Sequence, residues 1–206
     1  YRYARLLALN EVGGEPANPV PGVAGFHAAQ LRLRKEMPHG LTATATHDTK
    51  RGEDARMRIL ALAEISDDWA NAVAEWRRFN EPLVSSETGN RAPTANHEYM
   101  LYQTLIGAWP FEPINGTFIE RIQAYAIKAA REGKRSTSWT DPQESYEKRL
   151  TEFVGHILDR ERSTAFIESI AGLTRRTSLL GALNSLSQLT LKLTLPGVPD
   201  FYQGTE

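Results

Sequence analysis

The sequence predicts a mainly α-helical chain that holds only two short β-strands. Apolar residues recur every three or four positions over most of the 206 residues, a pattern typical of amphipathic helices. Strand candidates are confined to the alternating, Thr-rich run at 41–46 and to residues 198–202. Residues 47–197 separate the two candidates, whereas a crossover between parallel strands usually needs only a dozen or so residues.

Two strands with such a connection make a poor sheet by themselves. The simplest interpretation is that they are neighbouring strands of a larger barrel and that the helices between them form an inserted domain. The expected organisation is then a barrel segment at 1–48, a helical insertion domain at 49–195, and a second barrel strand with its following loop at 196–206.

The region before the first strand is divided by helix breakers. Paired glycines and a segment with three prolines interrupt the apolar periodicity, and a Pro-His-Gly sequence stops it before residue 41. The expected elements are the end of a helix at 1–11, a loop at 15–25, and a short helix at 26–37 with Ala28, Leu31 and Met37 available for burial.

The region between the strands contains helix start signals and apolar stripes. Trp69, Val73 and Trp76 share one face of a helix that opens at Ser66, which favours a core role for both tryptophans over sugar binding. The other expected helices are 55–65, 97–108, 117–132 with a capping box at Thr117 and Glu120, a helix after Asp141-Pro142 with a stripe from Tyr146 to Leu158, a helix capped by Ser163, and a leucine stripe from Leu179 to Leu193 that Pro196-Gly197 ends.

Composition excludes several classes of function. Lys and Arg number 24 against 25 Asp and Glu, so nothing indicates a nucleic-acid partner or an anionic membrane surface. No apolar run approaches the roughly 20 residues needed to span a bilayer. The absence of Cys excludes disulfides and fits a reducing compartment, so a cytoplasmic location is expected. The five His residues show no metal-binding spacing and no nucleotide-binding motif is present, so neither a metal nor a cofactor is expected.

The run from 41 to 56 is the most informative part of the chain. His47-Asp48 lies between the end of a predicted strand and the start of a predicted helix rich in charged residues, and barrel enzymes have their catalytic groups at such connections. Spacing alone favours the simpler interpretation that Asp48 caps the following helix. Lys50, Arg51 and the charges up to Arg56 are typical of a solvated helix face with local pairs such as Arg51–Asp54 or Lys50–Asp54.

Five segments together resemble the maltooligosyltrehalose synthases of the α-amylase family. They are THDTKRGEDAR at 46–56, YRYARLLALNEVGG at 1–14, NRAPTANHEYMLYQTLIGAWP at 90–110, STSWTDPQESYE at 136–147 and PGVPDFYQGTE at 196–206. The resemblance covers nearly the whole chain. It implies the C-terminal part of a (β/α)8 catalytic barrel, with the seventh and eighth strands and a helical insertion between them. Members of the family are several times longer, and two of their three catalytic carboxylates would lie upstream of Tyr1.

The resemblance also implies roles for particular residues. Asp48 matches the carboxylate that stabilises the oxocarbenium-like transition state, and His47 matches the imidazole that donates to hydroxyls of the bound sugar. Lys50 and Arg51 could bind the glucose that re-orients during the reaction. Lys134 and Trp139, in a polar loop, are weaker candidates for sugar contacts. Tyr202 at the end of the last strand could face the site, although strand packing explains it equally well.

The implied activity is that of an isomerase, an intramolecular transglucosylase of trehalose biosynthesis. It would convert the reducing-end α-1,4 linkage of a maltooligosaccharide into an α,α-1,1 linkage by a retaining double displacement, with the rest of the catalytic barrel as partner. The isolated chain would be inactive. Two alternatives stay open: an α-glucan hydrolase of the same superfamily, and a non-catalytic helical module that binds glucan or a partner.

Overall fold

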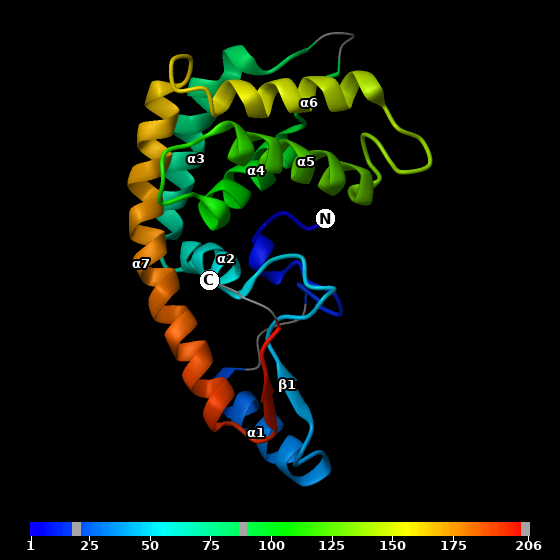
Figure 1. The fold of residues 1–206 in the computed structure, drawn as a ribbon, viewed down its shortest axis with the longest axis vertical. Helices are drawn as coiled ribbons and strands as arrows, with labels where there is room; N and C mark the ends of the chain where they lie inside the picture. Colours follow the sequence, from blue (N-terminus) through cyan, green and yellow to red (C-terminus); the bar gives the residue numbers. More distant parts are fainter. Residues whose placement is uncertain (18–21, 87–89, 203–206) are drawn as a thin grey trace.

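The computed structural model describes residues 1–17, 22–86 and 90–202 and consists mainly of helices (Figure 1). The helices are α1 (Gly22–Glu36), α2 (Glu53–Leu60), α3 (Ser66–Asn80), α4 (Ala95–Ala108), α5 (Gly116–Gly133), α6 (Glu144–Ile157) and α7 (Thr164–Thr194). Short 3-10 turns are η1 (Leu7–Leu9), η2 (Ala61–Ala63) and η3 (Glu81–Leu83). Among the described residues no helix is both long enough and apolar enough to cross a bilayer.

The two predicted strands lie side by side, as expected. Strand β1 (Leu41–Ala43) pairs in parallel with β2 (Val198–Asp200), with Leu41 opposite Val198 and Ala43 opposite Asp200. Both strands are shorter than predicted, and residues 203–206 of the last expected segment lie outside the described residues. Gly197 has φ +114°, and a Cβ there would lie 2.5 Å from Thr42 Oγ1, so only glycine fits where the chain enters β2.

A helical body made of α2 to α6 and the first half of α7 holds the core, above the strand pair in Figure 1. Trp76 lies at its centre, fully buried, with its ring edge-on to those of Tyr102 and Phe166. The indole N–H groups of Trp69 and Trp76 donate to Tyr99 and Ser169, each over 2.9 Å. Both tryptophans are therefore core residues, as predicted. The α6 stripe is also confirmed, since its members are all buried: Tyr146, Leu150, Phe153, Val154, Ile157 and Leu158.

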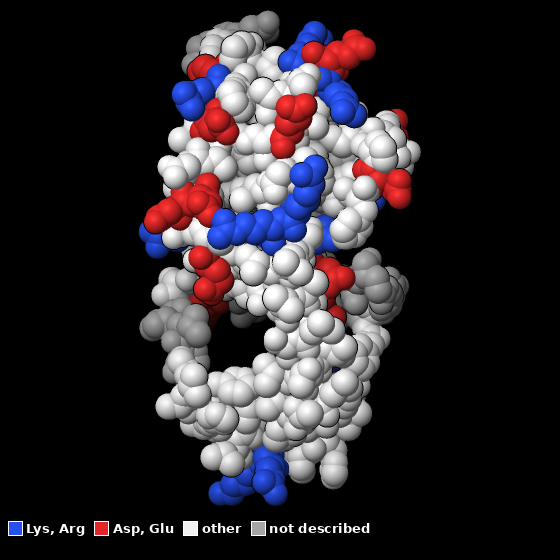
Figure 2. Space-filling model, turned by 90° about the vertical axis from the view of Figure 1, so that its left-hand side faces the viewer, with Lys and Arg blue, Asp and Glu red and all other residues white. Residues whose placement is uncertain are grey.

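The lower half of the molecule has no comparable core. Helix α7 is a single helix of 31 residues, and the leucine stripe on its second half is exposed rather than buried, with Leu179 at 65% and Leu186 at 61%. Helix α1 has no buried residue, so the expected burial of Leu31 and Met37 is wrong for this chain. In Figure 2 the lower half of the α7 side is nearly free of charged side chains down to its tip. Among the described residues, the two short strands and the start of the chain near α1 cover little of these apolar surfaces.

Several predicted helix boundaries are wrong. Residues 1–11 contain the 3-10 turn η1 and no α-helix, because Gln103 of α4 bonds the Leu7 N–H at 2.8 Å and the Ala4 carbonyl at 2.7 Å and holds this segment open. Asn115, not Thr117, caps α5 by accepting the Phe118 N–H. Helix α1 starts at Gly22 inside the predicted loop, and α6 starts at Glu144, so Pro142 precedes it.

Ser163 stands at the N-cap position of α7 without capping it. Its hydroxyl donates to the His156 carbonyl at 2.8 Å, which ties the start of α7 to the end of α6. Further along the same helix, α7 crosses α2 closely at Gly181, where a Cβ would lie 2.8 Å from Arg58 Cγ and 3.0 Å from Arg58 N. This close crossing fixes α2, and with it the segment that connects α2 to β1.

Candidate functional site

His47 and Asp48 occupy the tip of a turn just beyond the carboxyl end of β1. The Thr49 N–H and hydroxyl both bond the Thr46 carbonyl, at 3.2 and 2.8 Å, and the Thr46 hydroxyl accepts the Asp48 N–H at 3.3 Å. Both tip side chains are exposed. Helix α2 begins only at Glu53, with Gly52 at its N-cap, so the interpretation of Asp48 as a helix cap is wrong.

Tyr202 meets His47 at the same edge of the strand pair. The Tyr202 hydroxyl lies 3.4 Å from His47 Nδ1, although 155 positions separate the two residues. Because β1 and β2 are parallel, their carboxyl ends coincide, and the segments that leave them converge. The structure therefore brings together His47, Asp48 and Tyr202, three of the residues that the sequence singled out.

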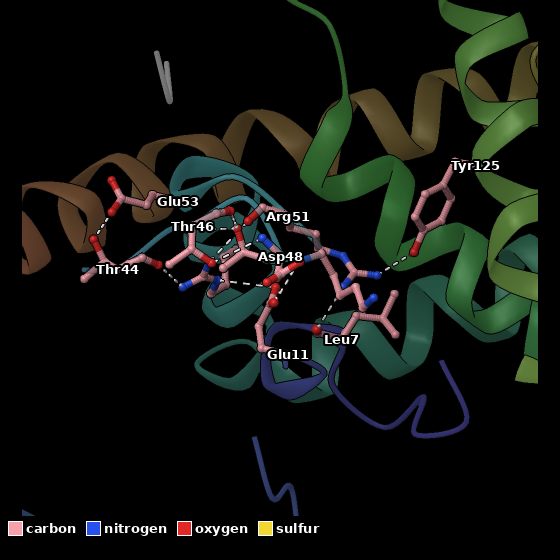
Figure 3. A network of polar contacts seen from close by, with 11 residues as sticks. Leu7, Glu11, Thr44, Thr46, Asp48, Arg51, Glu53 and Tyr125 are labelled. Carbon is pink, nitrogen blue, oxygen red and sulfur yellow. Dashed lines mark hydrogen bonds and ion pairs between the residues drawn. The ribbon is translucent and has the colours of Figure 1, made fainter. Parts of the chain in front are cut away.

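Residues 44–51, called the Asp48 loop below, are held by Arg56 of α2 and by Glu11 of the N-terminal segment. Figure 3 shows Glu11 beside the loop residues Thr46, Asp48 and Arg51. The Arg56 guanidinium donates to the Thr44 carbonyl at 2.7 Å and to the Arg51 carbonyl at 3.2 Å. The Glu11 carboxylate accepts the Lys50 N–H at 2.7 Å and lies 3.9 Å from Arg56 Nε. The prediction of a solvated helix face is wrong for Arg56, whose side chain is only 14% exposed.

Lys50 and Arg51 contact residues distant in the sequence instead of forming the expected local pairs. Lys50 Nζ lies 3.5 Å from a Glu132 carboxylate oxygen, and Arg51 donates to the Tyr125 hydroxyl at 2.5 Å and to the Leu7 carbonyl at 3.3 Å. These contacts attach the Asp48 loop to helix α5 of the helical body. Both side chains therefore bind protein groups in this structure. That they also bind sugar stays a prediction.

Lys192 forms a second attachment that sequence reasoning missed. Lys192 is only 4% exposed, and its ammonium donates to the Thr44 hydroxyl at 2.9 Å and lies 3.4 Å from a Glu53 carboxylate oxygen. The Thr44 hydroxyl in turn donates to Glu53, and the Phe201 ring centroid lies 4.0 Å from the ammonium. The only signal in the sequence was a lone charge within the leucine stripe.

Lys134 and Trp139 lie at the carboxyl end of α5, away from the strand pair. Lys134 adopts the left-handed conformation, with φ 53°, and lines an open depression of about 700 Å³. Trp139 is exposed, and its ring lies 4.9 Å from the Arg131 guanidinium. Arg131 and the Thr137 hydroxyl both donate to Glu147, and Arg131 holds the pKa of that carboxyl below its ordinary value. Among the described residues no hydrogen bond or ion pair joins Lys134 or Trp139 to His47 or Asp48.

The site has the residues for carbohydrate chemistry and shows no metal centre. Within residues 1–17, 22–86 and 90–202, no group of three or more His, Asp or Glu side chains could hold a metal ion. A carboxylate, an imidazole and a phenol at the ends of two parallel strands can accept and donate hydrogen bonds to sugar hydroxyls and can stabilise a developing positive charge. Such a constellation fits glycosyl transfer once a nucleophile and an acid are supplied.

Comparison with known proteins identifies relatives of the whole chain. No family model matches it. A Mycobacterium tuberculosis protein named "Putative maltooligosyl trehalose synthase" is 34% identical over 207 residues, which cover 100% of this chain and 25% of that protein. A crystal structure of a maltooligosyl trehalose synthase superposes with a TM-score of 0.85 at 37% identity, over 99% of this chain and 26% of that one.

The synthase structure from Arthrobacter ramosus superposes with a TM-score of 0.77 at 38% identity, over 98% of this chain and 24% of that one. The chain thus spans about a quarter of the length of the relatives that it matches. The chain is therefore homologous along its whole length to the maltooligosyl trehalose synthases, and the resemblance found in its motifs is confirmed.

Proposed function

We propose that this chain is part of an intramolecular transglucosylase that converts the reducing-end α-1,4 linkage of maltooligosaccharides into an α,α-1,1 trehalose linkage. The observation that carries the proposal is the position of Asp48. It lies on an exposed, well-anchored turn at the carboxyl end of a parallel strand, beside His47 and Tyr202, in a chain homologous to trehalose synthases.

The rest of the catalytic centre comes from further strands of a (β/α)8 barrel. Two features support this part of the proposal. Among the described residues no third strand pairs with β1 or β2, and parallel sheets are normally covered on both faces, whereas Leu41 is 75% exposed here. In the proposed organisation 1–48 and 196–206 contribute the seventh and eighth strands, and 49–195 form the helical insertion domain.

In the proposed mechanism Asp48 stabilises the positive charge of the transition state during both displacements. His47 donates hydrogen bonds to hydroxyls of the sugar at the cleavage point, and Tyr202 helps to orient the imidazole. The nucleophile and the general acid are carboxylates outside this chain. The released glucose re-orients within a pocket that excludes water and attacks through its anomeric hydroxyl, and the helical body forms one wall of that pocket.

The Asp48→Asn variant of the full-length protein tests the role of Asp48. The change removes the charge and keeps the shape, and among the described residues no hydrogen bond or ion pair reaches the Asp48 side chain, so the fold should persist. Turnover of maltopentaose should fall by a factor of about 10² to 10³ or more. Near-normal formation of trehalose-ended sugar by the variant would refute the assignment.

Product analysis separates the proposed mutase from the alternatives. A mutase yields a non-reducing, trehalose-ended oligosaccharide, whereas an α-glucan hydrolase releases reducing sugar and a binding module yields no product. The same assay on the purified 206-residue chain should show no activity, because in this proposal the nucleophile and the general acid lie outside the chain. If that chain converts maltopentaose, the catalytic carboxylates lie within it and the proposed roles are wrong.

A further inference from the structure

The Asp48 side chain has nothing of its own to hold it in place. Among the described residues no hydrogen bond or ion pair reaches its carboxylate, and its N–H bonds only the neighbouring Thr46 hydroxyl at 3.3 Å. The backbone of the Asp48 loop therefore sets the position of the Asp48 Cα–Cβ bond, and with it the region that the carboxylate can reach. Contacts that hold the two ends of that loop therefore hold the backbone of Asp48 in place.

Arg56 holds both ends of the loop with a single side chain. One guanidinium nitrogen bonds the Thr44 carbonyl, four residues before Asp48, and the other bonds the Arg51 carbonyl, three residues after it. A guanidinium is planar and rigid, so it sets the spacing between the two carbonyls as well as their positions. A lysine carries the same charge on a single nitrogen and cannot reproduce this spacing.

Glu11 contacts both the loop and Arg56. One of its carboxylate oxygens accepts the Lys50 N–H at 2.7 Å, and the other lies 3.9 Å from Arg56 Nε. The Glu11 and Arg56 side chains are 16% and 14% exposed. Glu11 Oε1 and Arg56 Nε are buried and find no hydrogen-bond partner in the described parts of the chain, so charge attraction rather than a direct hydrogen bond joins the two side chains.

From this geometry we propose that Glu11 and Arg56 are positioning residues for Asp48. They contact neither substrate nor reacting atoms in this proposal, which rests on the proposed function above. They hold the loop so that the carboxylate lies where positive charge develops in the transition state. Displacements of about 1 Å at a reacting centre can cost a factor of about 10² in rate, so a loosened loop should lower turnover.

The test compares Arg56→Lys and Glu11→Gln in the full-length protein with wild type and a matched control. Arg56→Lys keeps the charge but loses the pair of guanidinium nitrogens that bond the two carbonyls. We therefore expect kcat on maltopentaose to fall at least tenfold while KM changes less than twofold. Glu11→Gln keeps an acceptor for the Lys50 N–H, so its loss of kcat should be smaller than that of Glu11→Ala. An unchanged kcat in Arg56→Lys would overturn the proposal.

The control is Glu98→Gln in the helical body. Glu98 is fully buried and accepts a hydrogen bond from Arg91 at 2.7 Å, so the variant also disturbs a partly buried Glu–Arg pair. Among the described residues no hydrogen bond or ion pair joins Glu98 to the Asp48 loop. The variant should lower the melting temperature and leave kcat of the folded protein unchanged. A loss of kcat as large as that of Arg56→Lys would show that any such disturbance reduces turnover, which would also overturn the proposal.

A measurement without turnover separates this inference from the proposed function. Amide hydrogen exchange of peptides that cover residues 44–51 should accelerate in Arg56→Lys and Glu11→Gln and remain unchanged in Glu98→Gln. If wild type yields reducing sugar instead of trehalose-ended product, the proposed function fails, while the exchange pattern and the kcat ratios still decide the positioning role. Unaltered exchange in both loop variants would refute that role even if trehalose is formed.

Discussion

His97 should make the folding stability of this protein depend on pH between about 4 and 6.5. The side chain is buried at the first turn of α4, and burial lowers the pKa of His97 from its ordinary value of 6.5 to about 4, helped by the positive charge of Arg135. The Tyr146 hydroxyl accepts the Thr94 N–H at 3.3 Å and lies 2.5 Å from His97 Nδ1. Tyr146 therefore donates to a neutral imidazole, and protonation would remove that acceptor.

The sign follows from proton uptake. Between pH 6.5 and 4 the unfolded chain binds a proton at His97 and the folded chain does not, so the free energy of unfolding falls as the pH falls. The difference between pKa values of 6.5 and about 4 corresponds to about 3.4 kcal/mol below pH 4, of which about 2 kcal/mol is already lost at pH 5. Above pH 6.5 His97 contributes no pH dependence.

Urea unfolding of wild type and of His97→Asn at pH 8 and pH 5 measures this effect. The Asn side chain places an oxygen acceptor near the position of Nδ1 but does not titrate, so the variant should lose about 2 kcal/mol less than wild type between the two pH values. His39→Asn, at an exposed turn, serves as the control and should behave as wild type. Equal losses in His97→Asn and wild type would refute the reasoning.

Thermal unfolding can check three further predictions. Gly181→Ala should destabilise by about 1 to 3 kcal/mol because its Cβ would meet α2, whereas Gly172→Ala in the same helix has open space and should stabilise by up to about 1 kcal/mol. Asn115→Ala should cost about 1 kcal/mol through loss of the α5 cap. Glu147→Gln should destabilise more at pH 7 than at pH 3, because Arg131 lowers the pKa of Glu147 and its contribution is lost on protonation.

Local periodicity made the helical body predictable. The Trp69–Trp76 stripe and the α6 stripe are buried because each lies on one helix face within a core formed by the chain itself. The pairing of β1 with β2 followed from the shortage of other strands and is confirmed. The leucine stripe of α7 was also periodic, but a period reveals an apolar face and not what covers it, and most of these leucines are exposed here.

The candidate site was predictable at its tip and unpredictable in its support. His47 and Asp48 could be singled out because they lie in the sequence motif at 46–56. Glu11 and Arg56 could not, because they are residue types that usually lie on the surface and because 45 positions separate them. Lys192 was hidden in the same way. Contacts between distant segments depend on tertiary packing, which neither propensity nor spacing encodes. The roles of Lys134, Trp139, Lys50 and Arg51 in sugar binding remain predictions.

Helix α7 has a consequence for the order in which the protein assembles. Starting a helix is the costly step of its formation, and extension from an existing turn is comparatively easy. The first half of α7 is anchored in the helical body, so it supplies the nucleus from which the second half can grow without contacts of its own. Once the helical body has folded, the second half of α7 therefore exposes an apolar helix face roughly 20 Å long. The two strands and the elements next to them can then pack against this face.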